Sequence, residues 1–144
     1  MTRETPMRFA ITVAVLPMCM GAANAAVGDR FTCHVANVQN VDARRRPDSG
    51  FIEKNLRNRY EVTVGSSSIL LVYNYEGKVF SKDYPITGET KLFLVASKAD
   101  LFGVDTLALA KNPNARYNNA YPASLTVQGS FFANAWILLC SRVY

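Results

Sequence analysis

The sequence predicts an all-β fold, a small antiparallel β-barrel of about 7–8 strands, with a β-sandwich as the alternative. Along most of the chain apolar residues alternate with polar ones, and this period of two is typical of half-buried strands. Two cysteines, Cys33 and Cys140, lie near the two ends of the alternating region. The barrel is favoured because pairing the first strand with the last removes both exposed sheet edges.

An export signal is predicted over residues 1–25. Arg3 and Arg8 supply positive charge, residues 9–20 form an apolar run, and small residues follow it up to Ala25. The apolar run is shorter than the roughly 20 residues that span a bilayer. We therefore expect cleavage near Ala25 and a periplasmic or secreted protein without a transmembrane segment in the mature chain.

Lipid attachment at Cys19 is the alternative route of processing. A lipoprotein signal usually has a small residue before its cysteine, whereas this sequence has the bulky Met18 there. The sequence therefore favours cleavage without lipidation.

Residues 26–144 are expected to form a single β domain. They comprise 119 of the 144 residues, which is enough for one hydrophobic core. They hold 14 of the 16 basic and 10 of the 11 acidic side chains, a net charge of +4. This excess favours contact with anionic surfaces, but it is below the dense basic coverage of a nucleic-acid-binding protein. No nucleic-acid partner is expected.

Cys33 and Cys140 are expected to form a disulfide that links the first strand to the last. Export places the chain in an oxidising compartment. Cys33 shares a strand face with Phe31, and Cys140 shares one with Trp136, so both thiols can point into one core. A metal site is disfavoured, because the chain has no CxxC spacing and its only histidine, His34, would face away from Cys33.

The strands are predicted from alternation and from the turns that separate them. Residues 69–75 are apolar on both faces at first, which is typical of a central strand, and Glu76-Gly77 then predicts a hairpin turn. The predicted strands cover residues 31–36, 59–64, 69–75, 78–84, 91–97, 104–110, 124–128 and 131–143.

The segments between the predicted strands differ in character. Residues 40–58 interrupt the strand pattern and are expected to include a short helix around residues 51–56. A turn is predicted at residues 85–90 and one helical turn within residues 97–103. Residues 112–122, rich in proline and asparagine, are expected to form an exposed loop.

Basic residues concentrate in residues 44–59, and this basic loop is the first candidate binding site. Only Asp48 and Glu53 offset its six basic side chains. A guanidinium can hold a phosphate or carboxylate through two hydrogen bonds, so the loop suits an anionic glycan, a lipid head group or an acidic protein. The alternative is a solvated loop that only maintains solubility. The six residues are Arg44, Arg45, Arg46, Lys54, Arg57 and Arg59.

The asparagine-rich loop is the second candidate binding site. Tyr117 and Tyr121 flank Asn118 and Asn119. Aromatic faces stack on sugar rings and amides bind hydroxyl groups, so this composition can serve carbohydrate binding. The alternative is an ordinary solvent-exposed loop.

No catalytic, metal or cofactor site is predicted, and the protein is not expected to be an enzyme. No GxSxG motif surrounds a serine, and His34 lies beside the expected disulfide. The spacing of Asp83, Asp100 and Asp105 does not indicate a glycosidase pair. No phosphate-binding glycine loop or calcium-binding loop is present in the sequence.

The leading hypothesis is an exported, non-enzymatic binding module whose basic loop contacts an anionic envelope component or an acidic protein. The first alternative is a lipocalin-like carrier of a small apolar ligand. The second is an enzyme inhibitor built like the barrels of bacterial lysozyme inhibitors, with which size, signal and disulfide agree. The Ser/Gly-rich loop of those inhibitors has no counterpart in SGFIEKNLRNRY or GSSS, so no family is assigned.

Overall fold

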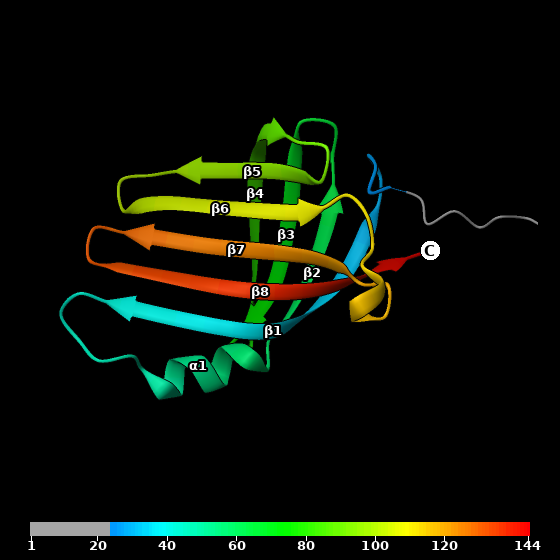
Figure 1. Ribbon diagram of the computed structural model, residues 1–144. Coiled ribbons are helices and arrows are strands. Elements are labelled where there is room, and N and C mark those ends of the chain that lie inside the picture. The colour runs from blue at the N-terminus through cyan, green and yellow to red at the C-terminus, as the bar shows by residue number, and fades with distance from the viewer. Residues whose placement is uncertain (1–23) are drawn as a thin grey trace, which may run out of the picture.

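The computed structural model describes residues 24–144 as a closed barrel of eight antiparallel strands, paired in chain order (Figure 1). An α-helix lies between the first two strands, and a 3₁₀ helix precedes the seventh. The predicted leader lies outside the described residues, apart from Asn24 and Ala25. The elements are β1 (Arg30–Asp42), α1 (Ser49–Leu56), β2 (Arg59–Val64), β3 (Ser68–Tyr75), β4 (Lys78–Glu89), β5 (Phe93–Ala99), β6 (Gly103–Ala110), the 3₁₀ helix (Ala115–Tyr117), β7 (Tyr121–Gly129) and β8 (Phe132–Val143).

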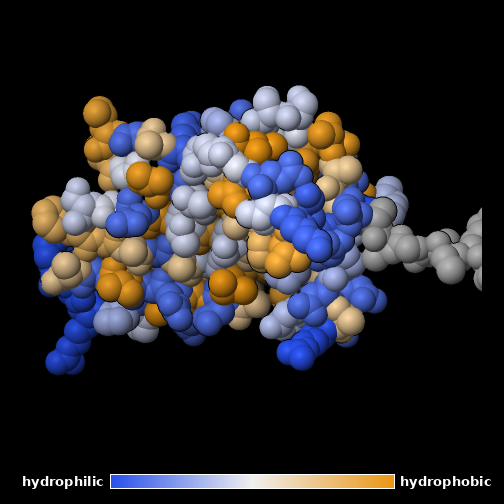
Figure 2. Space-filling model, turned by 45° about the horizontal axis from the view of Figure 1, so that its top comes forward, coloured by the Kyte–Doolittle hydropathy of each residue, from blue (hydrophilic) through white to orange (hydrophobic). Residues whose placement is uncertain are grey.

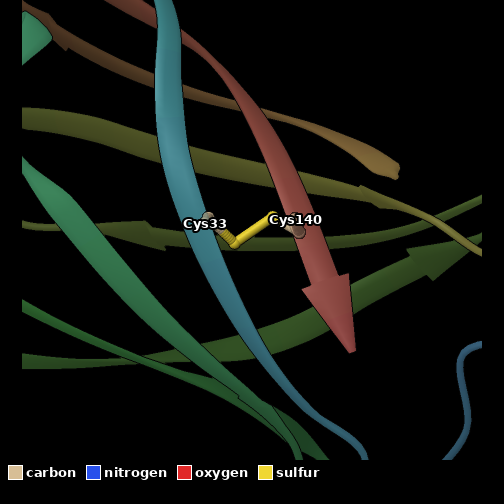
Figure 3. The surroundings of a disulfide bond; sticks show 2 residues. All are labelled: Cys33 and Cys140. Atoms are coloured by element: carbon tan, nitrogen blue, oxygen red, sulfur yellow. A yellow bond between two sulfur atoms is a disulfide. The ribbon is translucent and has the colours of Figure 1, made fainter. Parts of the chain in front are cut away.

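The barrel closes where β1 pairs with β8. Their ladder extends over nearly the full length of both strands. Within it Cys33 lies opposite Cys140, and the two residues form a disulfide (Figure 3). The prediction of a barrel whose first and last strands are linked by a disulfide is therefore confirmed.

Side chains fill most of the barrel. Alternate residues of the strands point inward, and Phe31, Leu71, Leu107 and Leu138 each have 1% or less of their surface exposed. Both cysteines belong to the same buried cluster. The interior is therefore a packed core over most of its length and not an open channel.

The connections divide between the two ends of the barrel. One end carries α1 and the turns β3–β4, β5–β6 and β7–β8, and we call it the helix end; in Figure 1 the last two turns lie at the left and α1 at the lower left. The other, the opposite end, carries the C-terminus and the connections β2–β3, β4–β5 and β6–β7. Because neighbouring strands are antiparallel, loops that alternate along the sequence lie at the same end.

The turn predicted at residues 85–90 is wrong. These residues belong to β4, which continues through Pro85 to Glu89. Pro85 has no amide hydrogen to donate, and the pairing of β4 with β5 begins only at the next residue, Ile86. The proline is tolerated in the strand because its unpaired side lies where the two strands have separated.

The helical turn predicted within residues 97–103 is also wrong. The strand β5 extends to Ala99, and a tight turn leads into β6. The carboxylate of Asp100 accepts hydrogen bonds from the backbone N–H groups of Phe102 (2.7 Å) and Gly103 (3.1 Å). An aspartate that binds the backbone in this way stabilises a turn instead of a helix.

The predicted short helix is confirmed as α1. The side chain of Asp48 caps it by accepting a hydrogen bond from the backbone N–H of Phe51 at 3.0 Å. The inner face of α1 contacts the barrel through Phe51, whose ring centre lies 6.1 Å from that of Trp136. The helix therefore partly covers the helix end of the barrel.

Candidate functional site

The six residues of the predicted basic loop flank α1, which connects the end of β1 to the start of β2. Arg59 at the start of β2 pairs with His34 in the first half of β1, so it lies farther along the barrel than the arginines that follow the end of β1 at Asp42. Arg44, Arg45 and Arg46 lie in the connection from β1 to α1, while Lys54 is on α1. The remaining two, Arg57 and Arg59, follow the helix and begin β2.

Only part of this positive charge is neutralised within the protein. Lys54 forms an ion pair with Glu76 (2.8 Å), and this hydrogen bond raises the pKa of Lys54. Arg44 lies 3.9 Å from the carboxylate of Asp42 and stacks over the ring of Phe131, 4.5 Å from its centre. Among residues 24–144, no ion pair involves the other four basic residues, Arg45, Arg46, Arg57 and Arg59.

Two shallow hollows flank α1, and the basic residues line both. The first, of about 290 Å³, lies between the β1–α1 connection and β8 and includes Arg45 and Arg46. The second, of about 430 Å³, lies between α1 and the β3–β4 turn and includes Lys54 and Arg57. Acidic side chains also line each hollow, two in the first and two in the second, so neither hollow has a net positive charge among its lining residues.

A third pocket, of about 190 Å³, opens into the barrel beside α1. We call it the aromatic pocket, because most of its walls are rings of inward-facing tyrosine, phenylalanine and tryptophan. Its lining residues are Phe51, Asn55, Tyr60, Tyr73, Tyr75, Phe80, Lys82, Tyr84, Leu125, Val127 and Trp136.

Strand register builds one wall of the aromatic pocket. Tyr60 on β2 lies opposite Tyr73 on β3, which lies opposite Phe80 on β4. Their ring centres are 5.3 and 5.4 Å apart, and the second pair is stacked at 18°. Burial raises the pKa of Tyr60 to about 12, so its hydroxyl is protonated at neutral pH. The wall is thus a row of flat apolar faces edged by hydroxyl groups.

A charged pair lies beside this wall. The ammonium of Lys82 on β4 contacts the carboxylate of Asp105 on β6 at 2.8 Å, across the gap where β4 and β5 do not pair. The Tyr84 hydroxyl donates to the same carboxylate at 3.3 Å, and burial followed by Asp105 raises the pKa of Tyr84. Burial opposes protonation of Lys82, but Asp105 outweighs it and the pKa of Lys82 is raised. Lys82 and Tyr84 line the pocket, so a cation and a hydroxyl group are available at this wall.

The two tyrosines of the second candidate site lie at the opposite end, away from the basic loop. Tyr117 belongs to the 3₁₀ helix and is half exposed. Tyr121 begins β7, and its ring is buried 5.0 Å from that of Phe31 and 5.3 Å from the guanidinium of Arg142. The structure therefore does not bring the two predicted sites together, and Tyr121 packs the end of the core.

Sequence reasoning missed the aromatic pocket. Its signal was the hairpin turn at Glu76-Gly77, which sets Tyr73 opposite Phe80 once the turn length is fixed. Both turn residues have positive φ, as a two-residue hairpin of this kind requires. The ion pair between Lys82 and Asp105 had no comparable signal, because β4 and β6 are not neighbours in the sheet.

Within residues 24–144 no cluster of histidine, cysteine, aspartate or glutamate could hold a metal ion. In the same range no helix is long and apolar enough to cross a bilayer. Comparisons with protein-family models, curated proteins and solved structures found no similar protein. The function is therefore inferred from the geometry of the helix end.

Proposed function

We propose that this protein is an exported, non-enzymatic binding module whose helix end contacts an anionic component of the cell envelope. One observation carries the proposal: the basic loop places its six cations before, on and directly after α1, and four of them form no ion pair among the described residues. The disulfide fits an oxidising compartment, in agreement with the predicted export signal.

The chemistry of the ligand follows from the side chains. Five of the six cations are arginines, whose planar guanidinium groups bind phosphate or carboxylate through paired hydrogen bonds. An anionic glycan, a lipid head group and an acidic protein all supply such groups. Because the arginines are exposed, their contribution is screened by salt, and binding weakens as ionic strength rises.

The test compares two triple substitutions of equal charge. Arg44→Ala, Arg45→Ala and Arg46→Ala remove three cations from the helix end, while Arg30→Ala, Lys91→Ala and Arg116→Ala remove three exposed cations from the opposite end. The first protein should bind dextran sulfate roughly a hundredfold more weakly at low ionic strength, since each exposed cation near an anionic surface contributes about 1 kcal/mol. The second should bind like the parent.

The assay is a salt titration of binding to dextran sulfate, to polyglutamate and to isolated envelope material. If the helix-end variant binds all three as tightly as the parent, the proposed function is wrong. Equal losses in both variants would show that net charge alone, and not the helix end, governs binding.

The aromatic pocket supports a second candidate function, the carriage of a small ring-shaped ligand. A dry cavity of about 150 Å³ can hold benzene, so a pocket of about 190 Å³ has room for one substituted ring. This candidate is a form of the lipocalin-like carrier of a small apolar ligand, with the ligand limited to about one ring. A ligand here would stack on Tyr73 and Phe80 and place a polar group near Lys82.

Native mass spectrometry of protein purified without denaturation tests this second function. A co-purified small molecule should be present in the parent and lost from Phe80→Ala, which removes one wall of the pocket. Phe93→Ala is the matched control, because Phe93 has similar exposure, 38% against 40%, but lies at the opposite end. Spectra without a bound molecule, or equal retention by both variants, would contradict the carrier function.

A further inference from the structure

Large apolar side chains project from the turns of the helix end. Leu101 and Phe102 in the β5–β6 turn are 98% and 83% exposed, and Phe131 in the β7–β8 turn is 55% exposed. We call these three residues the apolar tips. Single exposed apolar residues are common on proteins, but near-complete exposure of two consecutive large ones at a turn is not needed for folding.

The apolar tips lie side by side. The β5–β6 and β7–β8 turns end two paired strands, and a Cβ at Gly103 would lie only 1.9 Å from the carbonyl oxygen of Gln128. The absence of a side chain at Gly103 therefore lets the two turns approach closely. On the far side of the β7–β8 turn, the backbone N–H of Ala43 donates to the carbonyl of Phe131 at 2.8 Å. This bond joins the β1–α1 connection to the tips.

The arginines follow directly from that connection. Arg44 already stacks on Phe131, and Arg45 and Arg46 are the next two residues. Figure 1 shows the three connections ending together at the left, and Figure 2 shows hydrophobic and strongly hydrophilic groups beside one another at that side. The helix end thus joins exposed apolar tips to an arginine cluster.

We propose that this surface docks on an anionic phospholipid bilayer, with the apolar tips entering the interfacial region and Arg44, Arg45 and Arg46 binding lipid phosphates. The inference rests on the proposed function and names its ligand. Apolar side chains of interfacial proteins bury in the boundary between head groups and acyl chains, and adjacent cations add electrostatic attraction to anionic lipids.

Two features favour a bilayer over a folded protein partner. The apolar tips project from two separate turns, so a fluid surface can surround each one. The backbone N–H groups of Phe102 and Gly103 also already bind the side chain of Asp100, so these two donors are not free to pair with the backbone of a protein partner.

The experiment measures co-sedimentation with vesicles made of phosphatidylcholine alone or of equal parts phosphatidylcholine and phosphatidylglycerol. The parent should bind the anionic vesicles and bind the neutral ones far more weakly. Leu101→Ser with Phe102→Ser should lower vesicle affinity by roughly tenfold for each side chain, because burial of its apolar surface is lost. The arginine triple should lower it by about fivefold for each cation.

Matched controls lie at the opposite end. Val27→Ser with Leu92→Ser removes two exposed apolar side chains there, 67% and 59% exposed, and the triple of Arg30, Lys91 and Arg116 removes the same charge. Both should bind vesicles like the parent. Circular dichroism and thermal unfolding of all variants confirm that each one folds.

The outcomes separate this inference from the proposed function. If the arginine triple loses dextran sulfate and vesicles alike, but Leu101→Ser with Phe102→Ser binds vesicles like the parent, the bilayer inference is overturned and the proposed function stands. If no polyanion and no vesicle binds the parent at low salt, both fail. If the parent self-associates and the tip variant does not, while vesicles stay unbound, the tips bind a second copy of the chain instead.

Discussion

Tyr60 shows how one buried residue makes stability depend on pH. Its hydroxyl group lies at the edge of the aromatic pocket, and its ring is only 2% exposed. Burial disfavours the phenolate, and this effect outweighs a hydrogen bond with Asn58 that acts in the opposite direction. The pKa rises from 10.0 to about 12 as a result. The folded protein therefore holds a proton that the unfolded chain releases at lower pH.

We predict that the free energy of unfolding falls between pH 10 and pH 12. Below pH 10 both states are protonated and the stabilisation is complete; above it the unfolded chain ionises first, which favours unfolding. The loss attributable to Tyr60 reaches about 2–3 kcal/mol at the upper limit. Urea unfolding at a series of pH values measures it.

Two substitutions isolate the contribution of Tyr60. Tyr60→Phe should flatten the decline in stability with pH, leaving the part that comes from Tyr84, whose pKa burial also raises. Tyr117→Phe changes an exposed tyrosine and should leave the decline as it is in the parent. A decline of equal slope in the parent and in Tyr60→Phe would contradict the prediction.

One buried polar side chain of α1, Asn55, helps to hold the helix to the barrel. Asn55 is 3% exposed, and its amide donates to the carbonyl of Phe51 at 2.8 Å. Its carbonyl oxygen accepts the indole N–H of Trp136 at 3.1 Å. This bond places α1 over the aromatic pocket and fixes the position of the basic residues that flank the helix.

We predict that Asn55→Leu destabilises the protein by about 1–3 kcal/mol, because it leaves the buried indole N–H of Trp136 without its acceptor. Trp136 is the only tryptophan, so its fluorescence reports directly on the contact. Urea unfolding should show a lower midpoint, and the native emission should shift to longer wavelength as water reaches the ring. Asn74→Leu, at an exposed asparagine of β3, is the control and should show neither change.

Most elements could be predicted from the sequence because their signals are local. Alternation located all eight strands, and a break in it located α1. The predictions are wrong where the local structure depends on pairing with a strand that is distant in the sequence or on a side chain that binds the backbone. Pro85 is typical of a turn, yet it lies within β4 because that strand has only β3 beside it up to this residue. Asp100 and Gly103 shape a hairpin turn that resembles a helical turn in composition.

The functional surfaces depend on the arrangement of the whole barrel. The basic loop was found in the sequence because its six cations are close together along the chain. The apolar tips were not, because Leu101 and Phe131 are 30 positions apart and meet only once β6 pairs with β7. In the same topology the asparagine-rich loop, which connects β6 to β7, lies at the opposite end. The sequence shows the charge of each loop, whereas the strand topology of the barrel determines which loops lie at the same end.

At the scale of the molecule, two features join the first strand of the barrel to the last, namely the β1–β8 backbone ladder and the disulfide within it. The cysteines are 107 positions apart, so the covalent bond mainly restricts the unfolded chain. For a loop of about 100 residues the loop-entropy model gives about 4–5 kcal/mol, a large part of the roughly 5–15 kcal/mol that stabilises a typical domain. The ladder, by contrast, acts in the folded state, through backbone pairing along nearly the full length of both strands.

We therefore predict that reduction lowers stability without opening the native barrel. The reduced protein should keep the far-ultraviolet circular dichroism of the oxidised one in the absence of denaturant, and its urea midpoint should fall by an amount equivalent to about 4–5 kcal/mol or less. Cys33→Ala with Cys140→Ala should fall further, because both side chains are fully buried and their removal also leaves a small cavity. Coincident urea midpoints for the oxidised and reduced proteins would contradict the predicted loss of stability. A reduced protein without a β-sheet signal would contradict the prediction that the ladder maintains the barrel after reduction.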